Sequence, residues 1–200
     1  MQIQGVNISD MISQSIAVLK PWPTVATFEQ FEKRGGIREA IIYIGAASVV
    51  AAVVAFVFGL IGGIGGAIAA LVIGFVSPIV GFVVFAYVLF YVAKSQGGTG
   101  TQDEVFYTLS LFTAPIRAVT GAIGAIPLIG CLFMPVNLVL SIYQGYLAYL
   151  ACRASMNMEK NPAIISVVVA IVAMFVIGLV VAGILGAIFV GMMAASGALR

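Results

Sequence analysis

Histidine is absent from this chain, cysteine occurs only twice, and charged side chains make up only 8% of the residues. Soluble domains carry roughly 25% charged residues, so this shortage of charge, together with 62% hydrophobic residues, predicts a polytopic membrane protein. Cys131 and Cys152 lie at opposite ends of one predicted helix, ~30 Å apart, which is too far for a disulfide bond. Without histidine, a metal site built from nitrogen and sulfur ligands is not expected either.

Recognisable catalytic and nucleotide-binding motifs are also missing. The sequence has no Gly-x-Ser-x-Gly nucleophile elbow and no glycine-rich phosphate loop followed by Lys-Ser or Lys-Thr. Every acidic residue maps to a predicted surface or helix start, so no carboxylate pair is expected inside the membrane. Lys and Arg exceed Asp and Glu by only two (9 against 7), which is too little for a nucleic-acid surface. We therefore expect no enzyme activity, no cofactor and no nucleic-acid partner.

Residues 1–36 form the first predicted unit, which is too polar to span a membrane. Its predicted elements are a polar tail over residues 1–8, a helix from the Ser9-Asp10 cap to about Lys20, a Pro21-Trp22-Pro23 break and a helix over residues 24–34. The predicted apolar faces are Met11, Ile12, Ile16 and Leu19 on the first helix and Val25, Phe28 and Phe31 on the second, whose polar side carries Glu29, Glu32, Lys33 and Arg34. Both helices are expected to lie on the membrane surface; binding to a partner protein is the alternative.

Residues 37–200 form the second predicted unit, an all-α membrane domain. Five apolar segments are long enough to cross a bilayer: about 40–61, 66–93, 105–124, 136–151 and 162–195. Small residues at every fourth position predict close helix packing: Ala51, Ala55 and Gly59; Gly66, Ala70 and Gly74; and Gly183, Ala187 and Gly191. The fold class is therefore a five-span helical bundle with N-terminal interfacial amphipathic helices.

Basic residues are distributed unequally over the two predicted membrane faces. With five crossings, one face holds Lys20, Lys33, Arg34, Arg38, Lys94, Arg153 and Lys160, and the other holds Arg200, with Arg117 if its side chain extends that way. The positive-inside rule then places the N-terminus in the cytoplasm and the C-terminus outside.

Arg117 is the candidate functional residue, because it falls within the third predicted span, where a charge costs ~3 kcal/mol or more. In one interpretation its side chain extends outward to lipid headgroups. In the other it faces a polar cavity beside the proline breaks at Pro78 and Pro115 and binds an anionic lipid or solute. The expected partners in that cavity are Asn137, Ser141, Tyr143 and Gln144. Lys94, Asp103, Glu104 and Arg153 would form its cytoplasmic mouth, although a solvated surface role is favoured for these four residues.

Several short motifs resemble the Yip (Ypt-interacting protein) family. They are the Leu-Lys-Pro-Trp-Pro stretch followed by Thr-Phe, the loop Gly97-Gly98-Thr99-Gly100, the pair Ala114-Pro115 and the turn Ile126-Pro127-Leu128-Ile129-Gly130. The resemblance implies a five-span fold, and eukaryotic members are implied to bind prenylated Rab-type GTPases in vesicle traffic. This chain lacks the long hydrophilic N-terminal region and the Asp-Leu-x-Gly-Pro motif of those members. That difference argues against GTPase binding and for a prokaryotic member in the inner membrane.

Two functions follow from these observations. The first is a non-enzymatic membrane organiser or trafficking-type scaffold, which binds lipids, other membrane proteins or further copies of itself. The second is a small transporter or channel for an anionic solute or lipid, which uses Arg117 and the proline-broken spans. The second lacks an evident pair of inverted repeats and an embedded carboxylate for ion coupling, so the organiser is favoured.

Overall fold

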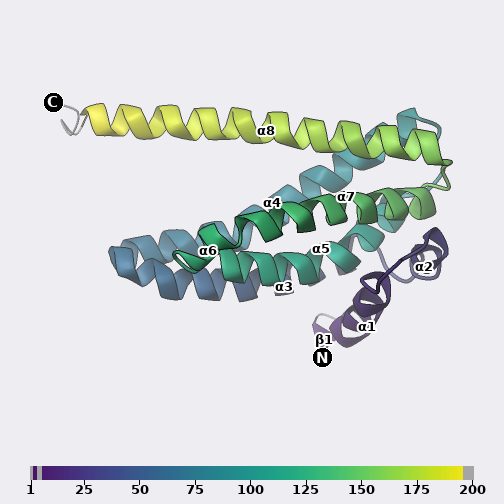
Figure 1. The fold of residues 1–200 in the computed structure, drawn as a ribbon, viewed down its shortest axis with the longest axis horizontal. Coiled ribbons are helices and arrows are strands. Elements are labelled where there is room, and N and C mark those ends of the chain that lie inside the picture. Colours follow the sequence, from purple (N-terminus) through teal and green to yellow (C-terminus); the bar gives the residue numbers. More distant parts are fainter. Residues whose placement is uncertain (1, 4–5, 196–200) are drawn as a thin grey trace.

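The computed structural model describes residues 2–3 and 6–195, and the chain folds almost entirely into helices (Figure 1). The elements are β1 (Gln2–Ile3), β2 (Val6–Asn7), α1 (Ile8–Val18), α2 (Val25–Glu29), α3 (Ile37–Gly59), the 3-10 turn η1 (Leu60–Gly62), α4 (Gly63–Ser95), α5 (Gln102–Gly124), α6 (Ile129–Leu132), α7 (Met134–Ser155) and α8 (Lys160–Ala195). The two short strands pair antiparallel, with Ile3 opposite Val6.

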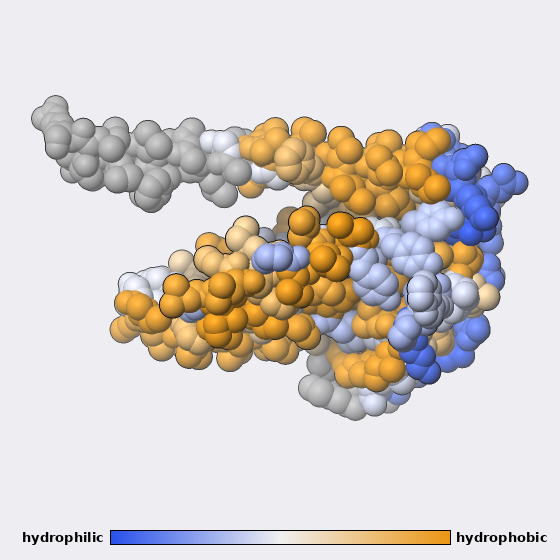
Figure 2. Space-filling view, in the orientation of Figure 1, coloured by the Kyte–Doolittle hydropathy of each residue, from blue (hydrophilic) through white to orange (hydrophobic). Residues whose placement is uncertain are grey.

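The five predicted membrane segments fall on α3, α4, α5, α7 and α8. Two stretches are long and apolar enough to be candidate membrane spans: Ile37–Ser95, which contains both α3 and α4, and Lys160–Val181. The helices alternate in direction, so α3, α5 and α8 begin at the end where α4 and α7 finish. Hydrophilic residues gather at this end, which we call the basic end, and apolar residues cover most of the remaining described surface in this view (Figure 2). Its basic residues are Lys33, Arg34, Arg38, Lys94, Arg153 and Lys160.

Helices α3 and α4 form a hairpin whose backbones approach closely at small residues. A Cβ atom added at Gly59 would lie 2.8 Å from the Cα of Ala67, and one at Gly74 would lie 3.2 Å from the Cα of Ala52. In lipid, helices gain little from apolar burial alone, so contacts of this kind supply dispersion energy that bulkier residues would prevent. The structure thus brings together the small-residue stripes of the first two predicted spans.

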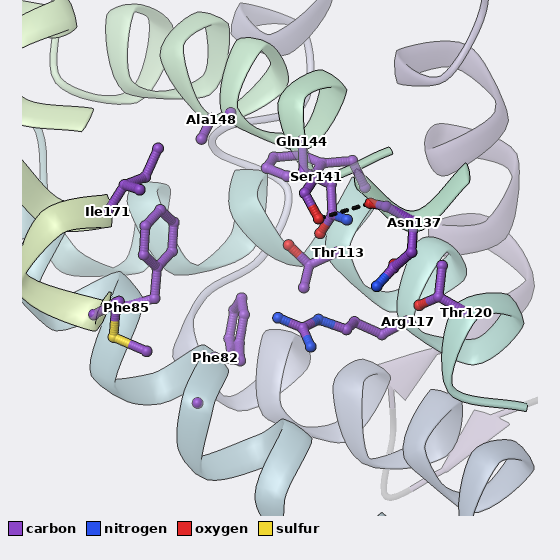
Figure 3. Close-up of a pocket in the computed structure, with 14 residues that line it drawn as sticks. Phe82, Phe85, Thr113, Arg117, Thr120, Asn137, Ser141, Gln144, Ala148 and Ile171 are labelled. Atoms are coloured by element: carbon purple, nitrogen blue, oxygen red, sulfur yellow. Dashed lines mark hydrogen bonds between the residues drawn. The ribbon is translucent and has the colours of Figure 1, made fainter. Parts of the chain in front are cut away.

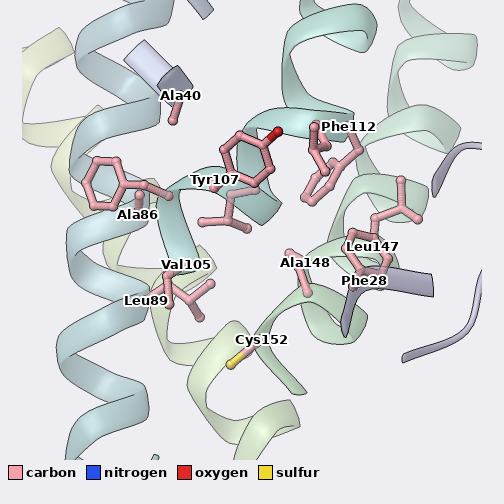
Figure 4. Close-up of a cluster of buried hydrophobic side chains, with 14 of the residues drawn as sticks. Phe28, Ala40, Ala86, Leu89, Val105, Tyr107, Phe112, Leu147, Ala148 and Cys152 are labelled. Atoms are coloured by element: carbon pink, nitrogen blue, oxygen red, sulfur yellow. The ribbon is translucent and has the colours of Figure 1, made fainter. Parts of the chain in front are cut away.

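Helix α5 runs through the centre of the core. Every residue from Val105 to Phe112 is buried, and its neighbours come from α2, α3, α4 and α7 (Figure 4). Its N-terminus is closed by Thr101, whose hydroxyl accepts the backbone N–H of Glu104, while the Glu104 carboxylate accepts the N–H of Thr101. This capping box satisfies two backbone donors that the helix cannot pair internally.

Helix α1 is fastened to the bundle by buried hydrogen bonds. The side chains of Ser15 and Tyr43 are 2.8 Å apart, and the Tyr107 hydroxyl donates to the Gln14 side chain over 2.9 Å. The predicted apolar face of this helix is divided: Met11 is buried against the bundle together with Gln14 and Ser15, whereas Ile12 and Ile16 are exposed. Polar residues can be buried here because tyrosines of the bundle satisfy their hydrogen bonds. The N-terminal cap of α1 is also not the predicted Ser9-Asp10 pair: the side chain of Asn7 caps the helix by accepting the backbone N–H of Asp10.

Helix α2 and the turn after it pack against α7, so the side of this segment that was predicted to be polar is partly buried. Phe28 is completely buried and its ring meets Phe112 edge to face, with centroids 6.3 Å apart. Glu32, predicted to lie on the polar side, is only 8% exposed, and its Oε2 has no hydrogen-bond partner among the described residues. The prediction for Glu32 was wrong because helical periodicity does not continue through the turn from residue 30 to residue 34.

Among its described side chains, helix α8 is buried against the bundle only near the basic end. Ala163, Val167 and Ala170 are buried, whereas no residue described from Ile171 to Val181 is buried. Figure 1 shows this helix running apart from the other helices towards the C-terminus. Of the predicted small-residue stripe on this helix, Gly183 makes no close contact, because a Cβ atom added there would have no described neighbouring atom within 4 Å. The packing of Ala187 and Gly191 lies outside the described residues.

Candidate functional site

A cavity of about 300 Å³ lies where α4, α5, α7 and α8 meet, at the level where α8 begins to leave the bundle. One part of its lining is polar and comes from α5 and α7: Thr113, Arg117, Thr120, Asn137, Ser141 and Gln144. The remainder is apolar and comes mostly from α4 and α8: Gly81, Phe82, Phe85, Ile171 and Met174, with Phe112, Gly145 and Ala148. The cavity is therefore amphipathic, with polar groups on two helices and apolar groups on the other two.

Arg117 reaches into this cavity between Phe82 and Asn137 (Figure 3). It is the one charged side chain among the lining residues, and it is exposed to the cavity. In the part of the chain that the structure describes, no hydrogen bond or ion pair reaches its guanidinium group. The five N–H donors of an arginine are thus available to a ligand that enters the cavity.

A second cavity of about 180 Å³ adjoins the first and is bordered by α3 and α4. Its lining residues are Ser48, Ala51, Pro78, Arg117, Thr120, Gly121 and Asn137. Arg117, Thr120 and Asn137 line both cavities, so the guanidinium group lies between two spaces with polar linings. A charged group inside a protein is less costly where water or a polar ligand can reach it.

The local sequence explains how Arg117 comes to face the cavity. Thr113 lies four residues before Arg117 and Thr120 three residues after it, so the three side chains share one face of α5. On α7, Asn137, Ser141 and Gln144 follow the same spacing, and the Ser141 hydroxyl donates to the Asn137 carbonyl oxygen over 2.8 Å. The two polar stripes are opposed across the cavity.

Most of the predicted partners of Arg117 lie at this cavity, and one does not. Asn137, Ser141 and Gln144 line it, whereas Tyr143 packs against the hydrophobic core and Tyr146, with ring centroids 6.5 Å apart. The threonines were missed by the sequence reasoning, although their spacing from Arg117 is a usable signal. The contributions of α4 and α8 had no such signal, because they depend on how the helices meet.

The four residues expected at a cytoplasmic mouth line neither cavity. Asp103 accepts the backbone N–H of Ile37 over 2.9 Å, and Lys94 donates to the Thr99 carbonyl over 3.3 Å. The guanidinium of Arg153 lies over the Tyr149 ring, 5.7 Å from its centroid, and Glu104 belongs to the capping box of α5. These contacts join helix ends and loops at the basic end.

The chemistry available at the cavity is that of anion binding. Its lining has no carboxylate, histidine or cysteine, and no group of three or more metal-ligating side chains occurs among the described residues. An anion ~4 Å from the guanidinium gains about 4 kcal/mol at an effective dielectric of ~20.

The fold and the cavity together define a helical protein with candidate membrane spans and a cationic, amphipathic cavity inside the bundle. The family model of the Yip1 domain matches residues 16–182, and the chain therefore belongs to the Yip1-domain family. No curated protein and no solved structure matches the sequence. The matched residues include α2 to α7 and the described packing region of α8, so both cavities lie within the family domain.

Proposed function

We propose that this protein is a non-enzymatic membrane organiser that holds an anionic phospholipid at Arg117. In this proposal α3, α4, α5, α7 and α8 cross the membrane, the basic end faces the cytoplasm, and the chain associates with lipids and other membrane proteins. The observation that carries the proposal is the guanidinium group of Arg117, which has no protein partner among the described residues and faces an amphipathic cavity.

The divided lining suits a phospholipid better than a small inorganic anion. The phosphate would meet Arg117 and the polar groups of Asn137 and Gln144, while the acyl chains would follow the apolar walls of α4 and α8. A volume of about 300 Å³ is at the lower end of the range for small-molecule pockets. It accommodates a phosphate and glycerol moiety, while the tails extend between α8 and the bundle.

The position of Arg117 along α5 favours a lipid from the leaflet opposite the basic end. Arg117 lies ~22 Å along the helix from Gln102 and ~10 Å from Gly124, at 1.5 Å per residue. A headgroup from the opposite leaflet therefore has the shorter distance to travel. On this side of the cavity the described α8 residues beyond Met174, residues 175–181, are exposed, which favours entry of the headgroup between α8 and the bundle.

Transport of an anionic lipid or solute is the second candidate, and the meeting of two cavities at Arg117 favours it. Towards the basic end, however, α8 is packed on the bundle through Ala163, Val167 and Ala170, and the core beside it is apolar. An anion leaving the cavity in that direction would cross a dry, apolar layer. We therefore favour binding over passage.

The test is lipid binding by the purified protein in nanodiscs, followed with phosphatidylglycerol and phosphatidylcholine as probes. Arg117→Leu should weaken phosphatidylglycerol binding about tenfold or more, because a hydrogen bond to a charged group is worth about 1.5–3 kcal/mol. Lys160→Leu is the matched control, since it also replaces a cation by leucine but at an exposed site at the start of α8. Unchanged saturable binding by Arg117→Leu would refute the proposal, and Arg117-dependent lipid flux in liposomes would support transport instead.

A further inference from the structure

Helix α1 has three distinct sides. One side faces the bundle and buries Ile8, Met11 and Val18 with the two hydrogen-bonded polar residues Gln14 and Ser15. The second side carries Ile12 and Ile16, which are 48% and 59% exposed. The third side is polar and exposed, with Ser9, Asp10 and Ser13. An amphipathic helix at a membrane surface has one apolar side in lipid and one polar side in water. A helix that also packs on a helical bundle has a third, buried side.

The hydrogen bonds of α1 fix its depth along the bundle. Its partner Tyr43 lies six residues from the start of α3, ~9 Å along that helix, and its partner Tyr107 lies five residues from the start of α5, ~7.5 Å along that one. Interfacial helices bury their apolar face roughly 5–10 Å into the boundary between headgroups and acyl chains. The two tyrosines therefore hold α1 at the depth of such a helix.

Trp22 is a further exposed apolar residue beyond the end of α1. It is 90% exposed, it is the single tryptophan of the chain, and it lies between Pro21 and Pro23. Its φ of 66° is a left-handed conformation, which costs a residue with a side chain roughly 1–2 kcal/mol. Such strain persists where the surrounding chain imposes it, and it gathers at functional positions.

Cations flank Trp22 along the chain. Lys20 precedes the Pro21-Trp22-Pro23 turn, and Lys33 and Arg34 follow α2. Tryptophan with nearby lysine and arginine is the composition that anchors proteins at an anionic membrane surface.

We infer that Ile12, Ile16 and Trp22 form a rigid lipid-inserting edge in the leaflet at the basic end, with anionic headgroups as its electrostatic partner. The inference takes the membrane crossing of α3 and α5 from the proposed function, but it is independent of the Arg117 cavity. It assigns α1 a third contact, with lipid, in addition to its contacts with the bundle and with water.

The test uses the fluorescence of Trp22 in the full-length protein, reconstituted in vesicles of phosphatidylcholine and phosphatidylglycerol. Lipids brominated near the glycerol end of the acyl chain should quench Trp22 more than lipids brominated near the methyl end, and its emission should shift to shorter wavelength than in water. Strong quenching by aqueous iodide, with none by either brominated lipid, overturns the inference.

Three variants in a Trp22→Phe background make the test directional. The fluorescence of Ile12→Trp should be quenched by the lipid brominated near the glycerol end and that of Ser13→Trp by iodide, although the two positions are adjacent. Equal quenching of both variants by lipid overturns the three-sided arrangement. Val50→Trp, on the exposed side of α3, should be quenched by the deep bromine. If that variant is quenched and Trp22 is not, the lipid-inserting edge fails while the crossing of α3 stands; if neither is quenched by lipid, the crossing itself fails.

Discussion

Replacing Gly59 by alanine tests whether α3 and α4 are held together by close backbone approach. The added Cβ would lie 2.8 Å from the Cα of Ala67 and 3.1 Å from the Cβ of Ala70. A backbone atom cannot rotate away, so the two helices must separate. Overpacking of this kind costs typically about 1–3 kcal/mol. For a chain of this length, each kcal/mol shifts Tm by about 2–4 °C, so we expect Gly59→Ala to lower Tm by about 2–12 °C.

The matched control is Gly65→Ala, at an exposed position near the start of α4 where no atom lies within 4 Å of the added Cβ. Alanine is favoured over glycine within a helix by roughly 0.5–1 kcal/mol, so this variant should keep or raise Tm. Thermal unfolding in one detergent, followed by far-ultraviolet circular dichroism, gives the order Gly65→Ala, wild type, Gly59→Ala and then Gly59→Leu. Equal Tm values for Gly59→Ala and Gly65→Ala would refute close packing at this crossing.

Two further predictions concern the basic end. Burial of the Glu32 carboxyl, followed by the nearby charge of Glu104, raises its pKa above the ordinary value. The folded state therefore binds this proton more tightly than the unfolded state, and the stability gained at low pH is lost as the pH rises through the folded pKa. Glu32→Gln should raise the free energy of unfolding at neutral pH by about 1 kcal/mol. It should also make Tm depend less on pH between acid and neutral conditions. Parallel plots of Tm against pH for Glu32→Gln and the wild type would contradict this prediction. The second prediction concerns Gly100, in the loop between α4 and α5. The Thr99 N–H of this loop donates to the Met156 carbonyl oxygen, and a Cβ atom added at Gly100 would collide with the neighbouring Ser155 carbonyl oxygen. Gly100→Ala should therefore cost about 2 kcal/mol or more in unfolding measurements, and a Tm equal to that of Gly65→Ala would show that this loop does not dock as described.

Local patterns in the sequence were sufficient for the helices themselves. The hydropathy of residues 37–195 predicts long apolar helices, because every backbone group must be paired within a segment that lies in lipid. The small-residue stripes of α3 and α4 are local signals of the same kind, and the structure contains them. The Leu-Lys-Pro-Trp-Pro stretch and the Gly97–Gly100 loop pointed to the family that the comparison with the Yip1 domain shows.

The arrangement around these helices was decided by contacts between distant residues. Gln14 and Ser15 are buried because Tyr107 and Tyr43, 93 and 28 residues away, satisfy them, and Glu32 is buried although its neighbours in sequence are charged. The sequence predicts that Arg117 lies within a span, but its cavity exists because α5 and α7 oppose their polar stripes and because α4 and α8, the latter through Ile171 and Met174, form the remaining walls. Periodicity and composition describe one helix at a time. The partner of each face is set by the total free energy of all helix contacts, which only the tertiary structure expresses.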